Sequence, residues 1–279
     1  MRFSEDQRAF VMFARRRADW IALGDPVGPF ESGTHAGWAF AEAARNANCR
    51  PVFFEVSAAR LPLMVEMGLA CHEIGEEAIV RLRDVPPGPV DGIDLHQPPH
   101  SAELLAELRA VSDVWLADRI GRDKRFSVGL FSEDYLNRFP LAVMRQEGRV
   151  VAFANLLAPG SGRRVSMDLM RYRPEGGVAL LETFLHALIA HCRDAGAEEC
   201  SLGLTPLAGL GKRRMARLWT RFGNVMFRHG SAFADFDELR AFKARFNPEW
   251  HPRYIALPVG VSPMLALADV AALIKGGRR

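Results

Sequence analysis

Several absences limit what this chain of 279 residues can be. It has only four cysteines, Cys49, Cys71, Cys192 and Cys200, with no CxxC or zinc-ligand spacing among them. That usage predicts reduced, mostly buried thiols in a cytosolic protein. No apolar run approaches the roughly 18 residues that a membrane-spanning helix needs. The opening residues, MRFSEDQRAF, lack the apolar region of a signal peptide.

Common motifs of nucleotide, metal and serine enzymes are also missing. The sequence has no Walker A pattern and no complete Gly-x-Gly-x-x-Gly fingerprint. His186 and His191 lie five residues apart, which is not the HExxH spacing of a zinc protease. Residues 160–162, Gly-Ser-Gly, do not form a Gly-x-Ser-x-Gly nucleophile elbow. These classes of chemistry are therefore weak candidates.

The composition is that of an ordinary globular protein. Hydrophobic residues make up 49% of the chain and charged residues 25%, enough apolar material for one large domain or two modest ones. The formal net charge is +3. A mildly basic chain tolerates an anionic partner but does not require one.

The most informative segment is a strand, turn and helix near the middle of the chain. Residues 166–172 read as a strand that carries Asp168 and Arg171, and the turn 173–177 leads into a helix from about Val178. A helix N-terminus offers N–H groups and partial positive charge to a phosphate or a developing oxyanion. The layout resembles the Arg/Gln-x-x-Gly-x-Gly/Ala loop of GNAT acyltransferases, which Val178 fits only partly. Acyl transfer is therefore the first candidate chemistry.

Alternating strand and helix patterns predict an α/β (α+β) fold made of two tandem GNAT-like acyltransferase folds, with mixed sheets flanked by helices. We expect the first half at residues 1–84, a Pro/Gly-rich linker at 85–99, and the second half, with the catalytic site, at 100–279. Predicted elements of the first half are a hairpin at 10–23, helices at 36–46 and 60–67, and strands at 52–56 and 74–82. Those of the second half are helices at 102–118, 178–191, 207–222 and 235–246, a hairpin at 141–156, and strands at 199–204 and 254–259.

Short motifs in both halves resemble the catalytic domain of aminoacyl-phosphatidylglycerol synthases, the MprF-type multiple peptide resistance factors. In the first half they are residues 23–28 (LGDPVG) and 74–78 (IGEEA). In the second half they are residues 134–140 (DYLNRFP), 152–155 (AFAN), 167–171 (MDLMR), 202–208 (LGLTPLA) and 242–254 (FKARFNPEWHPRY). The resemblance covers nearly the whole chain, and its most specific parts are the Asp-x-x-Arg strand and the last motif.

The resemblance implies the cytosolic catalytic part of a larger protein, natively fused to an N-terminal multi-span membrane domain. It implies transfer of an aminoacyl group, alanyl in preference to lysyl, from aminoacyl-tRNA to phosphatidylglycerol at the cytosolic face of the bacterial inner membrane. The product makes the membrane less anionic and so gives resistance to cationic antimicrobial peptides. Because the donor ester is already activated, no cofactor, metal or acyl-enzyme is required.

One departure from the family concerns the segment between the halves. The family has an Arg/Lys-rich helix there, whereas here Arg81 and Arg83 are followed almost at once by Pro86-Pro87-Gly88-Pro89. The basic helix is missing or much shortened.

The implied reaction needs a base for the acceptor alcohol and cations for the phosphates. Asp168 is the candidate general base, or the group that positions the acceptor hydroxyl; the alternative is a structural ion pair with Arg171. Arg171 and Lys243 are candidates for contact with the lipid phosphate or with the tRNA backbone and terminal adenosine. Lys243 is selected by its motif, since alone it would read as a solvated residue of an amphipathic helix.

Further residues are expected to bind substrate or to be structural. Glu182, early in the helix after the glycine turn, either contacts the aminoacyl ammonium or favours the helix dipole. Arg245, Arg253 and Tyr254 share the motif of Lys243. His72 is a candidate polar contributor from the first half, although a lone histidine is more often structural.

Lys212, Arg213, Arg217 and Arg221 form the main basic cluster of the chain. The three arginines recur every four residues and so share one face of the predicted helix. This face is expected either to meet tRNA phosphates or the anionic bilayer surface, or simply to be solvated.

Two other classes stay open. A CoA-dependent GNAT would be supported by an intact phosphate-binding loop, and Val178 argues against it. A non-catalytic tRNA- or lipid-binding module would have a dead site, and the Asp-x-x-Arg and Phe-Lys motifs argue against that.

Overall fold

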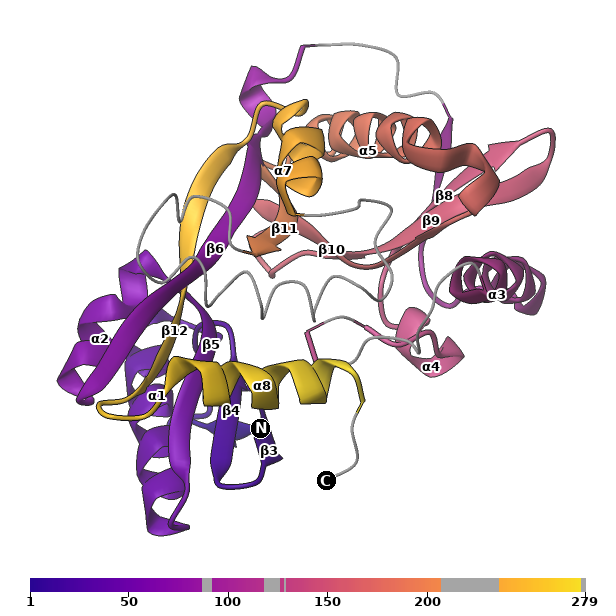
Figure 1. Cartoon of the computed structure of the whole chain (residues 1–279). Coiled ribbons are helices and arrows are strands. Elements are labelled where there is room, and N and C mark those ends of the chain that lie inside the picture. Colours follow the sequence, from indigo (N-terminus) through magenta and orange to yellow (C-terminus); the bar gives the residue numbers. More distant parts are fainter. Residues whose placement is uncertain (87–91, 118–125, 128, 207–235, 277–279) are drawn as a thin grey trace.

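A single mixed sheet of ten strands runs through the molecule (Figure 1). The computed structural model describes residues 1–86, 92–117, 126–127, 129–206 and 236–276. In order across the sheet the strands are β3 (Phe13–Arg16), β4 (Asp19–Leu23), β5 (Arg50–Ser57), β12 (Glu249–Pro258), β6 (Leu69–Arg81), β11 (Glu199–Pro206), β10 (Arg164–Tyr172), β9 (Arg149–Leu157), β8 (Leu141–Gln146) and β7 (Ile93–His96). Neighbours β4–β5 and β10–β11 are parallel, and the other neighbours are antiparallel. A short pair, β1 (Arg2–Phe3) and β2 (Phe10–Val11), lies beside the main sheet.

Helices cover both faces at the N-terminal end of the sheet. On one face α1 (Phe30–Asn46) and α2 (Leu61–Glu66) pack Phe40 and Met64 against Phe53 of β5 in one core cluster. On the other face α8 (Pro263–Ile274) packs Leu267 and Val270 over β4, β5, β6 and β12. Burial of apolar surface on both faces makes these strands nearly continuous hydrophobic runs.

The other end of the sheet is covered in the same way. α5 (Gly177–Asp194) and α7 (Phe236–Ala244) pack on one face, where Phe184 and Phe242 are buried. α3 (Ala102–Ala117) and the short α4 (Glu133–Leu136) cover the opposite face with Leu108 and Leu136. Short 3-10 turns, Ala58–Arg60, Leu82–Asp84 and Pro174–Gly176, connect elements of both ends.

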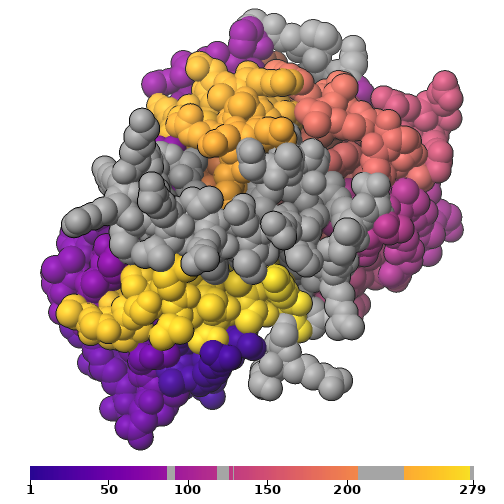
Figure 2. Space-filling view, viewed as in Figure 1, coloured from indigo at the N-terminus to yellow at the C-terminus, as the bar shows by residue number. Residues whose placement is uncertain are grey.

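The two ends of the sheet are joined by the long strands β6 and β12 (Figure 1). β12 comes from the C-terminal part of the chain but lies between β5 and β6, which come from the N-terminal part. The C-terminal residues that follow it form a surface band across the N-terminal strands (Figure 2). A pairing between residues nearly two hundred positions apart gives a fold of high contact order.

Most predicted elements are confirmed, and the differences have local causes. β6 starts at Leu69 and not at the predicted residue 74. The residues Cys71-His72-Glu73 interrupt the apolar pattern on which the prediction depended, although they belong to a strand that pairs with β12. β12 starts at Glu249 rather than at 254, although Pro252 stands within it. β7, an edge strand, lies within the range 85–99 that was expected as a linker. α8 was not predicted, and the predicted helix 207–222 lies outside the described residues.

The four cysteines are free thiols, with Cys192 and Cys200 buried and Cys49 and Cys71 half-buried. Within the described ranges, no helix combines the length and the apolarity that a bilayer crossing would take.

Candidate functional site

A row of irregular strand pairings crosses the centre of the sheet. In the pairing of β5 with β12, Glu55 has no partner residue, and in the pairing of β12 with β6, Ile74 has none. The pairing of β6 with β11 changes register at residues 202–203. β10 is irregular against β9 at 168–169, and its ladder with β11 ends at Ser166 although both strands continue. Bulges redirect side chains and are common beside active sites. This row is therefore the expected location of a functional site.

Lys243 is a buried cation on this row. It lies in the last turn of α7, and the residue is 7% exposed. Its Nζ donates to the carbonyl oxygens of Gly203, at 2.9 Å, and Leu204, at 3.1 Å, in the irregular part of β11. Burial lowers the pKa of Lys243 to about 7, against the opposing effect of the nearby Glu77 and Glu55 carboxylates. Near neutral pH the amine thus exchanges readily between its charged and neutral forms.

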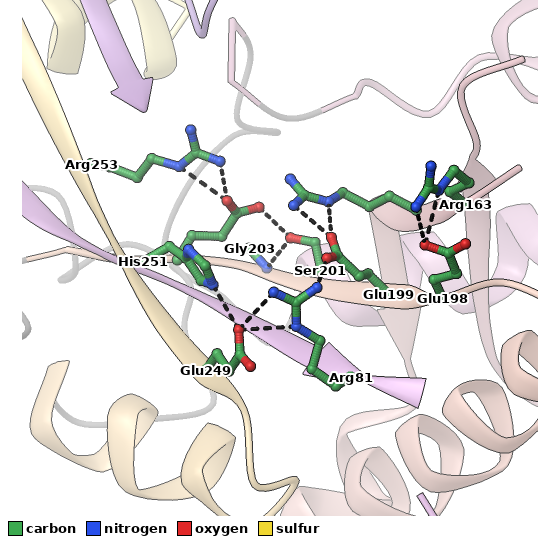
Figure 3. Close-up of polar contacts among 11 residues, drawn as sticks. Arg81, Arg163, Glu198, Glu199, Ser201, Gly203, Glu249, His251 and Arg253 are labelled. Carbon is green, nitrogen blue, oxygen red and sulfur yellow. Dashed lines mark hydrogen bonds and ion pairs between the residues drawn. The ribbon is translucent and has the colours of Figure 1, made fainter. Parts of the chain in front are cut away.

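Glu77 of β6 ties Arg253 and Ser201 together, and its negative charge acts on Lys243. Figure 3 shows Arg253 and Ser201 of this group. Arg253 donates to Glu77 Oε2 through Nε, at 3.0 Å, and through Nη2. Ser201 Oγ donates to the other carboxylate oxygen and accepts from the Gly203 N–H at 3.2 Å. Burial alone would raise the pKa of Glu77, but Arg253 and Ser201 outweigh it and hold that pKa below its usual range. Glu77 is therefore an ionised carboxylate with both oxygens engaged.

Glu55 is the second carboxylate near Lys243, and the sequence reasoning missed it. Phe54 and Val56, its neighbours on β5, are buried, whereas Glu55 is half-buried and has a φ of +68°. Burial raises the pKa of Glu55 to about 7; Glu77 also raises it, while Arg253 and Lys243 lower it. The available signal was a carboxylate inside the apolar run 52–56, where charged residues are rare without a partner.

Asp168 of β10 belongs to a neighbouring network that includes α4. Its Oδ1 accepts from the Gly129 N–H at 2.7 Å, and its Oδ2 accepts from the Tyr135 hydroxyl. A side chain at position 129 would overlap the Asp168 carboxylate. Burial and the bond to Asp168 raise the pKa of Tyr135 well above its usual range, so the phenol stays a donor. Asn155 of β9 stabilises the irregular pairing of β10 with β9 at residues 168–169, because its Oδ1 accepts from the Leu169 N–H at 2.7 Å.

Arg171, the other charged residue of the Asp-x-x-Arg strand, is buried against α3. Its guanidinium carbon lies 3.8 Å from the centroid of the Trp115 ring, and its Nη1 donates to the Met170 carbonyl at 3.3 Å. Stacking of a guanidinium on an indole is a favourable arrangement for a desolvated cation. Arg171 and Asp168 thus both face the helices α3 and α4, since each contacts one of them.

Glu182 and Arg245 form an ion pair with each other. Glu182 Oε2 accepts from Arg245 Nη1 at 2.7 Å, which joins α5 to the residue that follows α7. Their side chains are 29% and 55% exposed, respectively. At that exposure solvent screens most of the attraction between the two charges.

The exposure of this pair predicts a small stabilising effect. We expect a double-mutant cycle of Glu182→Gln and Arg245→Gln to give a coupling free energy below about 1 kcal/mol in urea unfolding. A coupling of several kcal/mol would contradict this and identify the pair as a principal link between α5 and α7.

The remaining predicted residues are spread over the molecule. His72 of β6 lies opposite Ile255, and burial lowers the pKa of His72. Tyr254 packs against the core on the α1 side. The basic cluster of Lys212, Arg213, Arg217 and Arg221 lies outside the described residues.

A more exposed set of ion pairs continues along the same strands (Figure 3). Arg81 pairs with Glu199 and, at 2.9 Å, with Glu249, which is 3.3 Å from His251. Arg164 reaches Glu199 at 2.6 Å. These pairs connect β6, β11, β12 and β10, so they hold in register the strands that carry the buried groups.

The structure therefore gathers Lys243 and Arg253 with three polar residues that sequence reasoning did not select: Glu55, Glu77 and Ser201. We call these five residues the seam cluster, because they lie where the two ends of the sheet join. Within the described part of the chain, no group of three or more His, Cys, Asp or Glu is placed to hold a metal ion. The cluster offers buried positive charge, an engaged carboxylate and a second carboxylate with a perturbed pKa, a combination typical of functional sites.

Comparison with known proteins agrees with this α/β architecture and identifies the family. The family model described as "Phosphatidylglycerol lysyltransferase, C-terminal" matches residues 1–85 and 91–257. The chain belongs to that family.

Solved structures and curated relatives show the same relationship. The fold matches the C-terminal domain of a putative lysylphosphatidylglycerol synthetase from Agrobacterium fabrum, with a TM-score of 0.86, 34% identity, and coverage of 99% of this chain and 89% of that one. It also matches L-PGS from Bacillus licheniformis, with a TM-score of 0.84, 30% identity, and coverage of 99% and 88%. Phosphatidylglycerol lysyltransferase of Staphylococcus aureus (strain MRSA252) is 29% identical over 98% of this chain, which spans 34% of that relative's length.

Proposed function

We propose that this chain transfers an aminoacyl group from aminoacyl-tRNA to a glycerol hydroxyl of phosphatidylglycerol. Family membership and the names of the relatives support the lipid acceptor and the class of transfer. The observation that carries the proposal is Lys243, a buried ammonium held on two backbone carbonyls where the strand ladders are interrupted. Such a preorganised cation suits the charge that develops during acyl transfer.

The chemistry requires one bond exchange. The oxygen of the glycerol hydroxyl attacks the ester carbonyl carbon, and the bond from that carbon to the ribose oxygen of the tRNA breaks. The hydroxyl loses a proton to a base, and the departing ribose oxygen takes one up. The new ester replaces the old one, so no external energy source or covalent enzyme intermediate enters the balance.

Within this proposal the described residues take separate roles. Lys243 donates to the oxyanion of the tetrahedral intermediate, using the N–H that is not bonded to Gly203 or Leu204. Asp168, oriented by Tyr135 on the α3 and α4 side, accepts the proton of the acceptor hydroxyl or positions it. It would reach the ester held by Lys243 where the pairing of β10 with β11 ends at Ser166. Arg171 adds positive charge on the same side of β10, where the lipid phosphate or the tRNA end is expected.

The identity of the donor and the setting of the whole protein belong to the same proposal. We propose alanine as the preferred aminoacyl group and lysine as the alternative that the relatives' names indicate. We also propose fusion to an N-terminal membrane domain and action at the cytosolic membrane face. The chain spans about a third of the length of its curated relatives, which leaves room for such a domain in the whole protein. Lowered membrane charge and resistance to cationic peptides would follow. We also propose the organisation into halves at 1–84 and 100–279 around the segment 85–99.

The pKa of Lys243 predicts a pH dependence. The charged amine is required in this mechanism, and because its pKa is about 7, the charged fraction falls as the pH rises through 7. The groups that act on it are the Glu77 and Glu55 carboxylates, with Arg253 beside them. We expect kcat/KM to fall about tenfold per pH unit well above pH 7, after subtraction of spontaneous ester hydrolysis. A profile that is flat to pH 9 would contradict the role of Lys243.

Lipid extraction tests the proposed function directly. The chain is mixed with phosphatidylglycerol micelles and with alanyl-tRNA or lysyl-tRNA that carries a labelled amino acid. We expect label to pass into the chloroform phase, faster from alanyl-tRNA. Label that stays in water with both donors, in a sample shown to be folded, contradicts the proposal. Tight acetyl-CoA binding by calorimetry would favour the CoA-dependent alternative.

A further inference from the structure

We propose that Glu55 binds the positively charged α-amino group of the aminoacyl donor. This inference rests on the proposed function and adds the recognition element for the donor. It assigns a role to a residue of the N-terminal part of the chain, so the donor would lie against both ends of the sheet.

The backbone at Glu55 is the first support. Glu55 is the extra residue where the pairing of β5 with β12 shifts, since Val56 lies opposite Tyr254 and Phe54 opposite Ile255. Its φ of +68° lies in the left-handed region, which is unfavourable for a residue with a Cβ. Glycine would adopt this conformation without that cost. Strained residues of this kind are concentrated at active sites and ligand contacts.

The hydrogen bonds of the seam cluster are the second support. Both oxygens of Glu77 are engaged, one by Arg253 and the other by Ser201. Within the described ranges no hydrogen bond or ion pair engages the Glu55 carboxylate. Arg253 and Lys243 lower its pKa through their charge, without a hydrogen bond to it. Glu55 is also half-buried rather than fully enclosed. It is therefore the carboxylate of the cluster that can accept hydrogen bonds from a ligand.

The chemistry of the donor is the third support. In an aminoacyl ester a single carbon separates the ammonium from the ester carbonyl. Groups that bind these two parts must therefore lie close together, one anionic and one able to donate to an oxyanion. Glu55 comes from β5 and Lys243 from α7, and each charge influences the pKa of the other group, so an anion and a cation of the seam cluster are both available to the donor. Charge-assisted hydrogen bonds would hold the ester in place for attack.

Donor discrimination by Glu55→Gln tests this assignment. The donors are alanyl-tRNA and its 2-hydroxypropionyl counterpart, made by deamination with nitrous acid, in which a hydroxyl replaces the ammonium. We expect wild type to prefer the alanyl donor about 10- to 100-fold in kcat/KM, as loss of a charged hydrogen bond implies. In Glu55→Gln the alanyl rate should fall by about that factor, while the 2-hydroxypropionyl rate stays within about threefold. The KM for phosphatidylglycerol should not change.

Control variants separate recognition from folding. Glu55→Gly relieves the backbone strain, so it would restore activity if Glu55 were only structural, and we expect it to stay as impaired as Glu55→Gln. Glu66→Gln, at an exposed site on α2, should behave as wild type. Equal loss of kcat/KM with both donors in Glu55→Gln would overturn the assignment. It would also be overturned if Glu55→Gln lost only lysyl transfer and kept the wild-type preference for the alanyl over the 2-hydroxypropionyl donor. If wild type transfers neither donor, the proposed function itself fails.

Discussion

Replacing Lys243 with methionine is expected to reduce aminoacyl transfer by at least about 100-fold, the usual effect of removing an oxyanion donor. The change removes the ammonium that is held on the carbonyls of Gly203 and Leu204 while it keeps most of the side-chain volume. The loss should be in kcat rather than in the KM for either substrate, because the contact forms only with the developing oxyanion.

The same variant is expected to fold normally. The lowered pKa of Lys243 means that the folded protein holds the ammonium less favourably than water does. The variant no longer has the unfavourable free energy of burying a charge. That gain offsets the cost of leaving two carbonyl oxygens without a donor, which is about 1–3 kcal/mol for each oxygen. We therefore expect a melting temperature within about 5 °C of wild type.

Lys275→Met is the matched control, because this lysine is exposed at the end of α8. It should leave both transfer and melting temperature unchanged. Full activity in Lys243→Met would show that the buried amine has no part in the reaction. An unfolded Lys243→Met would show that its hydrogen bonds are chiefly structural.

Replacing Asp168 with asparagine is expected to have a similarly large effect on transfer, about 100-fold or more, the range for loss of a catalytic base. The amide cannot accept a proton from the acceptor hydroxyl. It can still accept from the Gly129 N–H, so the local fold should survive. Initial rates with saturating phosphatidylglycerol measure the effect, and circular dichroism checks folding.

Tyr135→Phe provides the comparison for this prediction. It removes the hydroxyl that donates to Asp168 but leaves the carboxylate in place. We expect a smaller loss, about tenfold, from weaker orientation of the base. If Asp168→Asn keeps full activity, Asp168 is not the base. If Tyr135→Phe is as damaging as Asp168→Asn, the phenol itself takes part in proton transfer.

Local patterns predicted much of the fold, because they depend on residues close in sequence. The hairpin predicted at 141–156 is confirmed as β8 and β9, and Glu147 and Gly148 at its turn have positive φ values. The amphipathic pattern around Lys243 predicted α7 within a residue of its start. Neither pattern, however, indicates which strands become neighbours.

The position of β12 shows why the seam cluster could not be assembled from sequence. Arg253 reaches Glu77 only because a C-terminal strand inserts between β5 and β6. That pairing depends on burial of both faces by helices far apart in the chain, and no local period encodes it. Glu77 and Tyr135 stood inside motifs that the resemblance singled out, yet their partners were visible only in the folded chain. Glu55 carried a usable signal, as a carboxylate inside an apolar strand.

A crystal structure of the chain with 3′-alanylamino-3′-deoxyadenosine, a stable amide analogue of the donor end, would locate the aminoacyl group. We expect its amide oxygen within hydrogen-bond distance of Lys243 Nζ and its amino group against the Glu55 carboxylate. Binding at any other place, with the seam cluster unchanged, would contradict the assignment of this cluster as the aminoacyl site.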